Sequence, residues 1–319
     1  MSLSKKTKRW LSENCRVSLA GKTVVVTGAN SGVGFKTAEI ALLLGADVIL
    51  ACRNPAKAEA AKAALLRDYK GASVSYRQLD LSDLDSVKAF AAALRADAVD
   101  VHAFVNNAGA FRHPNEKTKQ GFDLVLGTNY LGVYVLCEKL LPYLASLGHA
   151  VRLINTVSLI CRSVKTVDYA DFRSEKRRYR TLAVYGCSKL CLARYSRALA
   201  ARYAETNVSV VMNHPGIAIT PLGLDAFGKW ARVLAVPIRP LLNSPEKSAL
   251  SFAYVMSLDL PAGAIVGPDR FFGALGYPRV NRIPKQVTEG ADELIAFTEK
   301  ALGAAGGAST ITERKEVSA

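Results

Sequence analysis

Short apolar runs alternate with longer segments of helical periodicity along most of this chain. Buried strands are predicted at 24–26, 48–51, 74–80, 101–105, 151–157 and 208–211, with a final strand at 265–272. Helical segments of ten or more residues separate most of these runs, and parallel strands need such crossovers. The pattern therefore predicts an α/β fold with one doubly wound, Rossmann-type parallel sheet and helices on both faces.

The later helices are expected at 122–147, where Pro142 should bend or interrupt the helix, at 182–204, after the cap Ser244-Pro245-Glu246, and at 291–301. A polar excursion runs from Arg162 to Thr181. The sequence shows no internal repeat, so we expect a single domain over 1–319, with its core at 20–302. Small and charged residues predict a disordered tail at 303–319.

The composition indicates which cellular compartment the chain suits and whether it holds a metal site. Half of the 319 residues are apolar, which is enough for one large core. The six cysteines lack C-x-x-C spacing and there are only four histidines, so we expect no metal site and a reducing compartment. Because the first twenty residues hold no uninterrupted apolar core, neither a cleaved signal nor a membrane span is expected there, and we predict a cytoplasmic protein.

A formal charge of +15 raises the question of a nucleic-acid partner. Lysine and arginine are spread along the whole chain without a zinc-finger, helix-turn-helix or RNP pattern, so we expect no nucleic acid. The densest basic run, 173–180, is typical of a solvated face. A basic surface can still attract an anionic cofactor, or give weak peripheral membrane contact through the N-terminal residues 5–10.

The turn Thr27-Gly28-Ala29-Asn30-Ser31-Gly32-Val33-Gly34 follows a strand and opens a helix. Its three glycines let another group lie against the main chain, and the free N–H groups of a helix start attract a phosphate. A glycine-rich turn that only links strand to helix is the alternative. Further along the chain, Tyr185 and Lys189 lie four apart on one helix face, where an ammonium lowers the pKa of a nearby phenol.

Four motifs in order resemble the short-chain dehydrogenase/reductase family over residues 20–302: TGANSGVG at 27–34, NNAG at 106–109, Tyr185-x-x-x-Lys189, and Pro215-Gly216 with Thr220 following. The resemblance implies that Tyr185 is the general acid/base, that Ser158 polarises the substrate carbonyl, that Lys189 lowers the pKa of Tyr185, and that Asn129 holds a water. It implies cofactor contacts at Gly28, Asn30, Ser31, Gly32, Val33, Gly34, Arg53, Asp80, Leu81, Asn107, Ala108, Gly109, Asn129, Tyr185, Lys189, Pro215, Gly216 and Thr220.

The interval from Ser158 to Tyr185 is 185 − 158 = 27 residues, longer than in compact members of the family. With ANSGVGF, ACRN, SKL and NHPG, it is most similar to the retinol-dehydrogenase and protochlorophyllide-reductase-like branch. That implies a lipophilic substrate of the retinoid, steroid or other ketone or aldehyde type. It also implies a homodimer or homotetramer paired through helices 122–147 and 182–204. A further implication is a substrate lid at 222–242. Core packing or an oligomer surface would explain the apolar residues of that stretch as well.

The cofactor is expected to be NADP(H). NAD-selective sites place a carboxylate at the end of the second strand, whereas this chain has Cys52-Arg53 there, with Lys57 nearby to assist. A guanidinium attracts a 2′-phosphate that a carboxylate would repel. The rival function is a regulatory protein that binds NADP(H) without turnover.

Several other residues are better explained by structure than by chemistry. His214 is expected to be a hydrogen-bonded loop residue, and Cys187 and Cys191 to be core residues. Asn106 and Asn107 fit a structural role as well as a contact with adenosine.

Overall fold

One mixed sheet forms the centre of the computed structural model, which describes residues 3–111, 114, 116–165, 167–175, 179–217 and 242–304. Within these ranges the sheet has eight strands in the order β3-β2-β1-β4-β5-β6-β7-β8. The strands are β1 (Thr23–Thr27), β2 (Asp47–Cys52), β3 (Val74–Gln78), β4 (Val101–Asn106), β5 (Val151–Thr156), β6 (Val208–Asn213), β7 (Ile265–Arg270) and β8 (Leu275–Asn281). The predicted doubly wound α/β fold is confirmed.

The first seven strands are parallel, and β8 is antiparallel to β7. Strand order reverses between β1 and β4, because the chain first builds outward to β3 and then returns to the other side of β1. In sheets of this kind a crevice forms outside the carboxyl ends of the strands at the reversal point. The glycine turn after β1 and the NNAG turn after β4 both lie at that point.

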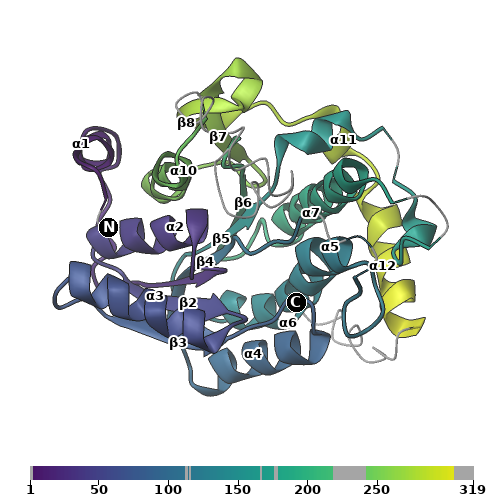
Figure 1. Cartoon of the computed structure of the whole chain (residues 1–319), viewed down its shortest axis with the longest axis horizontal. Helices are drawn as coiled ribbons and strands as arrows, with labels where there is room; N and C mark the ends of the chain where they lie inside the picture. The colour runs from purple at the N-terminus through teal and green to yellow at the C-terminus, as the bar shows by residue number, and fades with distance from the viewer. Residues whose placement is uncertain are drawn as a thin grey trace.

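Helices cover both faces of the sheet (Figure 1). One apolar core joins the sheet to α2 (Gly32–Leu43), α3 (Pro55–Asp68) and α10 (Pro245–Ser257). The other joins it to α4 (Leu84–Ala96), α6 (Gly132–Ala145), α7 (Thr181–Arg202) and α12 (Ala291–Ala304). The shorter helices are α1 (Lys5–Asn14), α5 (Leu124–Leu126) and α11 (Lys285–Thr288), with π-helical η1 (Gly127–Leu131) and 3₁₀ segments at Leu159–Ser163, Tyr169–Asp171 and Phe271–Gly273.

Polar caps explain where the surface helices begin. The side chain of Asn54 accepts from Lys57 N at 2.9 Å and starts α3, and Ser244 accepts from Lys247 N at 3.2 Å and starts α10. Asp83 caps α4 through the N–H of Asp85 at 3.0 Å. Each cap satisfies one N–H that has no partner inside the helix. The helix start predicted after Ser244 is confirmed.

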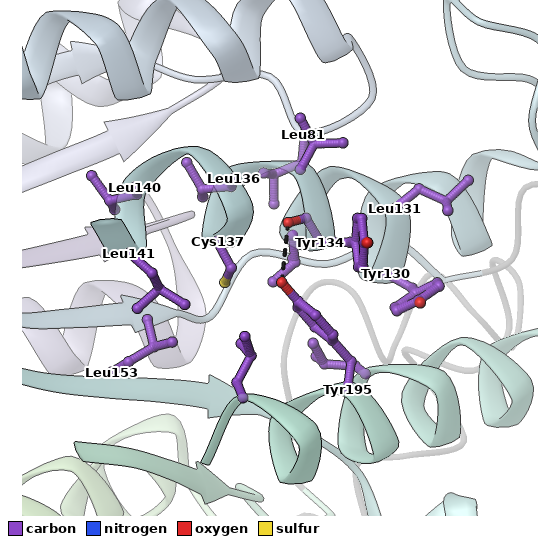
Figure 2. Close-up of a cluster of buried hydrophobic side chains, with 14 of the residues drawn as sticks. Leu81, Tyr130, Leu131, Tyr134, Leu136, Cys137, Leu140, Leu141, Leu153 and Tyr195 are labelled. Carbon is purple, nitrogen blue, oxygen red and sulfur yellow. Dashed lines mark hydrogen bonds between the residues drawn. The ribbon is translucent and has the colours of Figure 1, made fainter. Parts of the chain in front are cut away.

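The core between α6 and α7 positions the helices that hold the candidate catalytic residues. Figure 2 shows Leu141 of α6 facing Leu153 of β5, with Tyr195 of α7 reaching towards α6. The hydroxyl of Tyr195 donates to Glu138 Oε1 at 2.8 Å and lies 3.4 Å from the backbone oxygen of Tyr134. A fully buried tyrosine with a satisfied hydroxyl fixes the spacing of two helices more firmly than apolar contact alone.

The segment Leu124–Ala145, which spans α5 to α6, is long and apolar enough by length and composition to cross a membrane. In this structure 83% of its most apolar window is buried inside the protein. The core helix of a soluble protein passes the same test, so the segment by itself is weak evidence for a membrane span.

The expected interruption of this helix at Pro142 is wrong. Helix α6 continues through Pro142 to Ala145, and the irregular turn lies earlier, in η1. That turn includes Asn129, whose side chain is held by residues outside the helix. A π-turn is common where a functional side chain must be re-aimed.

Four further differences concern the first helix and the last part of the chain. The last predicted strand ends at Arg270 rather than 272, and β8 was not predicted because Gly276 and Pro278 interrupt its strand pattern. Helix α1 was not predicted either, because only Thr7 and Leu11 on it are buried. The final helix extends to Ala304, so the predicted tail begins inside it, and residues 305–319 lie outside the described part. The single domain over 1–319 stays a prediction.

Helix α1 packs against elements from the other end of the chain. The ring of Trp10 stacks on Tyr277 of β8, with centroids 5.5 Å apart and planes 8° from parallel. The hydroxyl of Thr7 donates to Glu246 Oε2 of α10 at 2.9 Å. These contacts close one end of the core formed by α2 and α10.

Candidate active site

The glycine turn after β1 is closed by the NNAG turn after β4. Gly28 has φ +66°, and a Cβ on it would lie 3.0 Å from both Cα and Cβ of Ala108. A Cβ on Gly34 would lie 2.6 Å from Gly28 O and would overlap the side-chain amide of Asn107. Only glycine fits at either position, because real Cβ atoms do not approach this closely.

Thr27 ties the two turns together. Its hydroxyl oxygen accepts from the backbone N–H of both Asn107 and Ala108 at 2.9 Å, and its backbone oxygen accepts from Asn107 Nδ2 at 2.9 Å. Asn107 therefore has a structural role, which was one of the two interpretations of this residue, beside contact with adenosine. Asn106 is also structural, since Nδ2 donates to Asn155 Oδ1 at 2.8 Å in the buried interior.

The start of α2 has the features of an anion site. Ser31 is at the N-cap position, but its side chain forms no capping hydrogen bond, and the first turn of α2 has no acidic residue. By contrast, the caps of α3 and α10 are made by their own side chains. The unpaired N–H groups of α2 and the positive end of its dipole suit a phosphate. Asn30, Gly32 and Val33 lie at this helix start, and their contact with a cofactor stays a prediction.

The end of β2 lies beside the glycine turn, since Gly28 N donates to Ala51 O at 2.8 Å. The buried thiol of Cys52 accepts from the N–H groups of Ala29 and Asn30, and burial raises its pKa. Arg53 is exposed and forms no hydrogen bond or ion pair with any residue in the described ranges. Its guanidinium is therefore available to a ligand at the edge of the glycine turn.

Asp80 and Leu81 follow β3 and are held by the protein itself. Asp80 Oδ1 accepts from the backbone N–H and hydroxyl of Ser82 at 2.9 and 2.6 Å. Leu81 is buried, and its backbone oxygen lies so close to Gly132 that no Cβ would fit there. Both residues shape the rim of the crevice, and their predicted contact with a cofactor stays a prediction.

Asn129 links three parts of the site. Its Oδ1 accepts from Ala110 N at 2.6 Å, while Nδ2 donates to Ala110 O and to Ser188 Oγ, both at 3.0 Å. All the side-chain hydrogen-bonding groups of this buried residue are thus engaged with the NNAG turn and α7. The expected contact between Asn129 and a water molecule stays a prediction. Because the side-chain amide is engaged, the water would have to bind a backbone atom of Asn129.

The ammonium of Lys189 is buried below Tyr185. Nζ donates to Thr156 O at 2.8 Å and lies 5.9 Å from the centroid of the Tyr185 ring. Burial lowers the pKa of Lys189 to about 8, so most of it is still protonated at neutral pH. Lys189 also faces the NNAG turn, since a Cβ on Gly109 would lie 3.8 Å from Nζ and 3.0 Å from Asn129 Oδ1.

Tyr185 and Ser158 meet by a hydrogen bond between their side chains. Burial raises the pKa of Tyr185 to about 12, and the bond to Ser158 offsets only part of that rise. Loss of water around the phenol is thus the larger effect in this structure, and the expectation that Lys189 lowers the pKa of Tyr185 stays a prediction. The edge of Phe111 contributes to that loss, with ring centroids 4.7 Å apart.

The end of β6 positions Pro215 and Gly216. Pro215 O accepts from Ser248 Oγ at 2.8 Å, and Gly216 has φ +73° with no room for a Cβ beside Pro268 and Asn243. Thr220 and residues 222–241 of the proposed lid lie outside the described residues, so only Leu242 of that segment is described.

The structural interpretations of the remaining polar residues are confirmed. His214 is buried, its backbone N–H donates to Val266 O, and Nε2 lies 3.3 Å from Asn281 Nδ2. Burial lowers its pKa to about 4, with a smaller contribution from the charge of Arg162. Cys187 and Cys191 are buried in the core between α6 and α7.

Three residues that organise the site were missed from the sequence. Thr27 joins the two turns, Thr156 holds Lys189 by its backbone, and Ser188 holds Asn129. The signal available for Thr27 and Thr156 was a hydroxyl residue at the last position of a buried strand. Ser188 lies next to Lys189 on the helix, and nothing in the sequence identified Asn129 as its partner.

Comparisons with known proteins find relatives over most of this chain. The family model described as short chain dehydrogenase matches residues 22–227. Human retinol dehydrogenase 14 is 37% identical over 276 residues, which cover 79% of this chain and 78% of the relative. Human retinol dehydrogenase 12 is 40% identical over 210 residues, which cover 65% of this chain and 66% of the relative.

A similar solved structure comes from Mycobacterium paratuberculosis and is described as an uncharacterized protein. It is 31% identical, covers 92% of this chain and 97% of its own, and superposes with a TM-score of 0.73. The likeness therefore extends over nearly the whole described fold.

Proposed function

We propose that this chain, which belongs to the short-chain dehydrogenase family within its retinol dehydrogenase branch, is an NADP(H)-dependent oxidoreductase that interconverts a carbonyl and an alcohol on a lipophilic substrate. The observation that carries the proposal is the meeting of Ser158, Tyr185 and Lys189 at the carboxyl end of β5. A hydroxyl pair with a buried ammonium beneath it suits proton transfer to a carbonyl oxygen.

A bound nicotinamide supplies or accepts the hydride in this chemistry. Tyr185 supplies the proton: in reduction its hydroxyl donates to the carbonyl oxygen as the carbonyl carbon gains the hydride, which leaves an alcohol and a phenolate. A phenol with a pKa of about 12 is fully protonated at neutral pH, so the resting site holds the proton that reduction needs. Ser158, bonded to Tyr185, is placed to donate to the same oxygen and fix its orientation.

Lys189 stabilises the phenolate left after proton transfer. Its ammonium is positioned by Thr156 O, and with a pKa of about 8 it is mainly charged at pH 7. In a site with little water this charge acts more strongly than it would at the surface. Asn129 fixes the NNAG turn above it and thereby sets the distance between the turn and the ammonium.

The residues of the glycine turn fit a dinucleotide. Gly28 and Gly34 let the turn pack closely against the NNAG turn, and the start of α2, which has no side-chain cap, suits a pyrophosphate. Arg53 is exposed at the end of β2 and has no ion-pair partner among the described residues, so its guanidinium can pair with a 2′-phosphate. These features support NADP(H) over NAD(H).

The names of the relatives support a lipophilic substrate. The similar human proteins are retinol dehydrogenases, and we infer a retinoid, a steroid or another apolar ketone or aldehyde for this chain. The rival function is a regulatory protein that binds NADP(H) without turnover. The presence of Asn129, Ser158, Tyr185 and Lys189 together disfavours the rival, because a protein that only binds the cofactor has no need for an acid/base relay.

A substrate screen tests the proposal. Purified protein is mixed with NADPH and, in turn, retinal, steroid ketones, aliphatic aldehydes and quinones, and loss of NADPH absorbance is followed. We expect turnover with at least one apolar carbonyl and little with polar sugars. NADPH binding without turnover on every class, measured beside an active short-chain reductase, would favour the regulatory protein.

We also propose a cytoplasmic protein with weak peripheral membrane contact and no nucleic-acid partner. Helix α1 turns Thr7 and Leu11 inward and leaves Lys5, Lys6, Lys8 and Arg9 exposed, which suits an anionic lipid surface. Sedimentation with vesicles of anionic and of neutral lipid, repeated at high salt, tests this. Binding that ignores lipid charge would contradict it.

Pairing into a homodimer or homotetramer is also a proposal. One face of the α5 to α7 region is already covered by α12, where Thr298 Oγ1 lies 2.7 Å from the hydroxyl of Tyr130 and Phe297 packs edge-on to Phe172. Pairing through these helices must therefore use their remaining surface, and light scattering on the purified chain measures the state.

A further inference from the structure

Two histidines and a carboxylate meet at the amino ends of β4 and β5, at the opposite edge of the sheet from the candidate active site. Asp100 directly precedes β4, His102 is the second residue of that strand, and His149 lies two residues before β5. Because β4 and β5 are hydrogen-bonded neighbours, the fold brings together residues that are 149 − 102 = 47 positions apart.

The ligand atoms of these residues converge. His149 Nε2 lies 2.5 Å from Asp100 Oδ1, and His102 Nε2 lies 3.9 Å from Asp100 Oδ2. The two rings stack with centroids 4.0 Å apart and planes 9° from parallel, so both Nε2 atoms face the same carboxylate. One ligand atom from each residue lies within 4.8 Å of the others.

The second nitrogen of each ring faces a backbone oxygen. His102 Nδ1 lies 3.1 Å from Asp100 O, and His149 Nδ1 lies 3.2 Å from Ala150 O. The backbone N–H of Thr23 also donates to Nδ1 of His102, at 3.4 Å. Without an ion, Nε2–H of His149 donates to the Asp100 carboxylate. An ion that takes the place of this proton leaves Nδ1–H donating to the carbonyl of Ala150, which is the arrangement found behind metal-bound histidines.

We propose that Asp100, His102 and His149 bind a divalent transition metal ion, with Zn²⁺ as the best match. Two imidazoles and one carboxylate are ligands that Zn²⁺ accepts, and water completes a tetrahedral set. Bonds of about 2.1 Å place tetrahedral ligand atoms roughly 3.4 Å apart. The distances of 2.5 and 3.9 Å differ from that value by less than an ångström, so small side-chain rotations suffice.

Solvent access and charge bear on the strength of this site. The side chain of Asp100 is 63% exposed, against 29% for His149 and 16% for His102, so an ion can enter from solvent and keep a water ligand. Lys22 is a positive neighbour that disfavours further positive charge at His149. We therefore expect moderate affinity that strengthens when this charge is removed.

Zinc titration of the untagged full chain by calorimetry tests the proposal. We expect about one Zn²⁺ per chain, a loss of tenfold or more in affinity for His102→Ala with His149→Ala, and several-fold tighter binding for Lys22→Met. Zn²⁺ should also raise the melting temperature of the wild type and leave that of the double variant unchanged, because only the folded site binds the ion.

A matched pair of carboxylate variants separates this site from general surface charge. Asp100→Asn should weaken zinc binding, whereas Asp97→Asn should not, because Asp97 is an exposed carboxylate that pairs with Arg77 instead. Where His102→Ala destabilises the fold, the single variant His149→Ala in the loop gives the same comparison. Equal zinc affinity in the wild type and the histidine variants, or no stoichiometric binding to the wild type, would overturn the proposal.

Discussion

The side-chain amide of Asn107 occupies the space that a Cβ on Gly34 would need. This contact holds the glycine turn against the NNAG turn, so we predict that Gly34→Ala lowers NADPH affinity at least tenfold and destabilises the fold by about 1–3 kcal/mol through overpacking. Calorimetric titration with NADPH and urea unfolding measure the two effects. Gly148→Ala is the matched control, because nothing lies within 4 Å of a Cβ there. Similar losses in both variants would remove the special role of this contact.

Tyr185→Phe should abolish turnover and leave cofactor binding nearly intact. The change removes the hydroxyl that bonds to Ser158 and keeps the ring that packs against Phe111. Loss of general acid help should lower kcat by about 10²-fold or more. Steady-state kinetics on the substrate found by the screen, with an NADPH titration of the same variant, checks this. A kcat close to wild type would refute the assigned mechanism.

Cofactor preference should depend on residues 52 and 53. We predict higher kcat/KM with NADPH than with NADH in the wild type, and a reversed or erased preference in Cys52→Asp combined with Arg53→Ala. Since the thiol of Cys52 faces the N–H groups of Ala29 and Asn30, a carboxylate at that position lies against the turn and repels a 2′-phosphate.

The control for this prediction is Arg67→Ala. Arg67 is an exposed arginine on α3 that pairs with Asp68, so its removal lowers net charge without touching the turn. A preference that falls equally in the control would point to general surface charge. Equal kcat/KM for the two cofactors in the wild type would refute NADP selectivity and leave the Tyr185 chemistry unaffected.

Buried His214 should make the fold acid-sensitive. Its folded pKa of about 4 lies below the ordinary 6.5, so the unfolded chain binds the proton more tightly. The stability that the neutral ring contributes is fully present above pH 6.5 and is lost as pH falls towards 4, by at most roughly 3 kcal/mol. Urea unfolding between pH 4.5 and 7 should show a shallower pH slope for His214→Gln than for wild type.

His149 acts in the opposite direction and needs a separate control. The hydrogen bond to Asp100 raises its pKa, so its contribution is present below pH 6.5 and is lost as pH rises through the folded value. Asp100→Asn removes that contribution, and the slope assigned to His214 should persist in this background. If His214→Gln leaves the slope unchanged in both backgrounds, the acid sensitivity has another source.

Much of the fold could be predicted because most of its parallel strands are buried on both faces and read as continuous apolar runs, with partly exposed β3 as an exception. Strand β8 lacks that signal, since its exposed arginine and its Gly276 and Pro278 look like a loop. Helix α1 lacks it as well, because its place depends on the contact between Trp10 and Tyr277 rather than on its own periodicity.

In the candidate site too, contacts within one helix could be predicted, whereas contacts between residues far apart in the sequence could not. Tyr185 and Lys189 could be paired from their spacing on one helix, and their contact is confirmed. The pKa of Tyr185 could not be predicted, because it depends on water excluded by residues far away in the sequence, Phe111 among them. The cluster of His102 and His149 carries no sequence pattern, since only the pairing of β4 with β5 joins its parts.

The stacking of Trp10 on Tyr277 also bears on the order in which the chain acquires its structure during synthesis. The ribosome makes Trp10 early, and its partner follows 277 − 10 = 267 residues later. At about 5–20 residues per second, that delay is roughly 13–53 s. During most of this time α1 has neither Tyr277 nor Glu246 to pack against, so α1 of the nascent protein stays undocked and accessible to chaperones until both residues have been made.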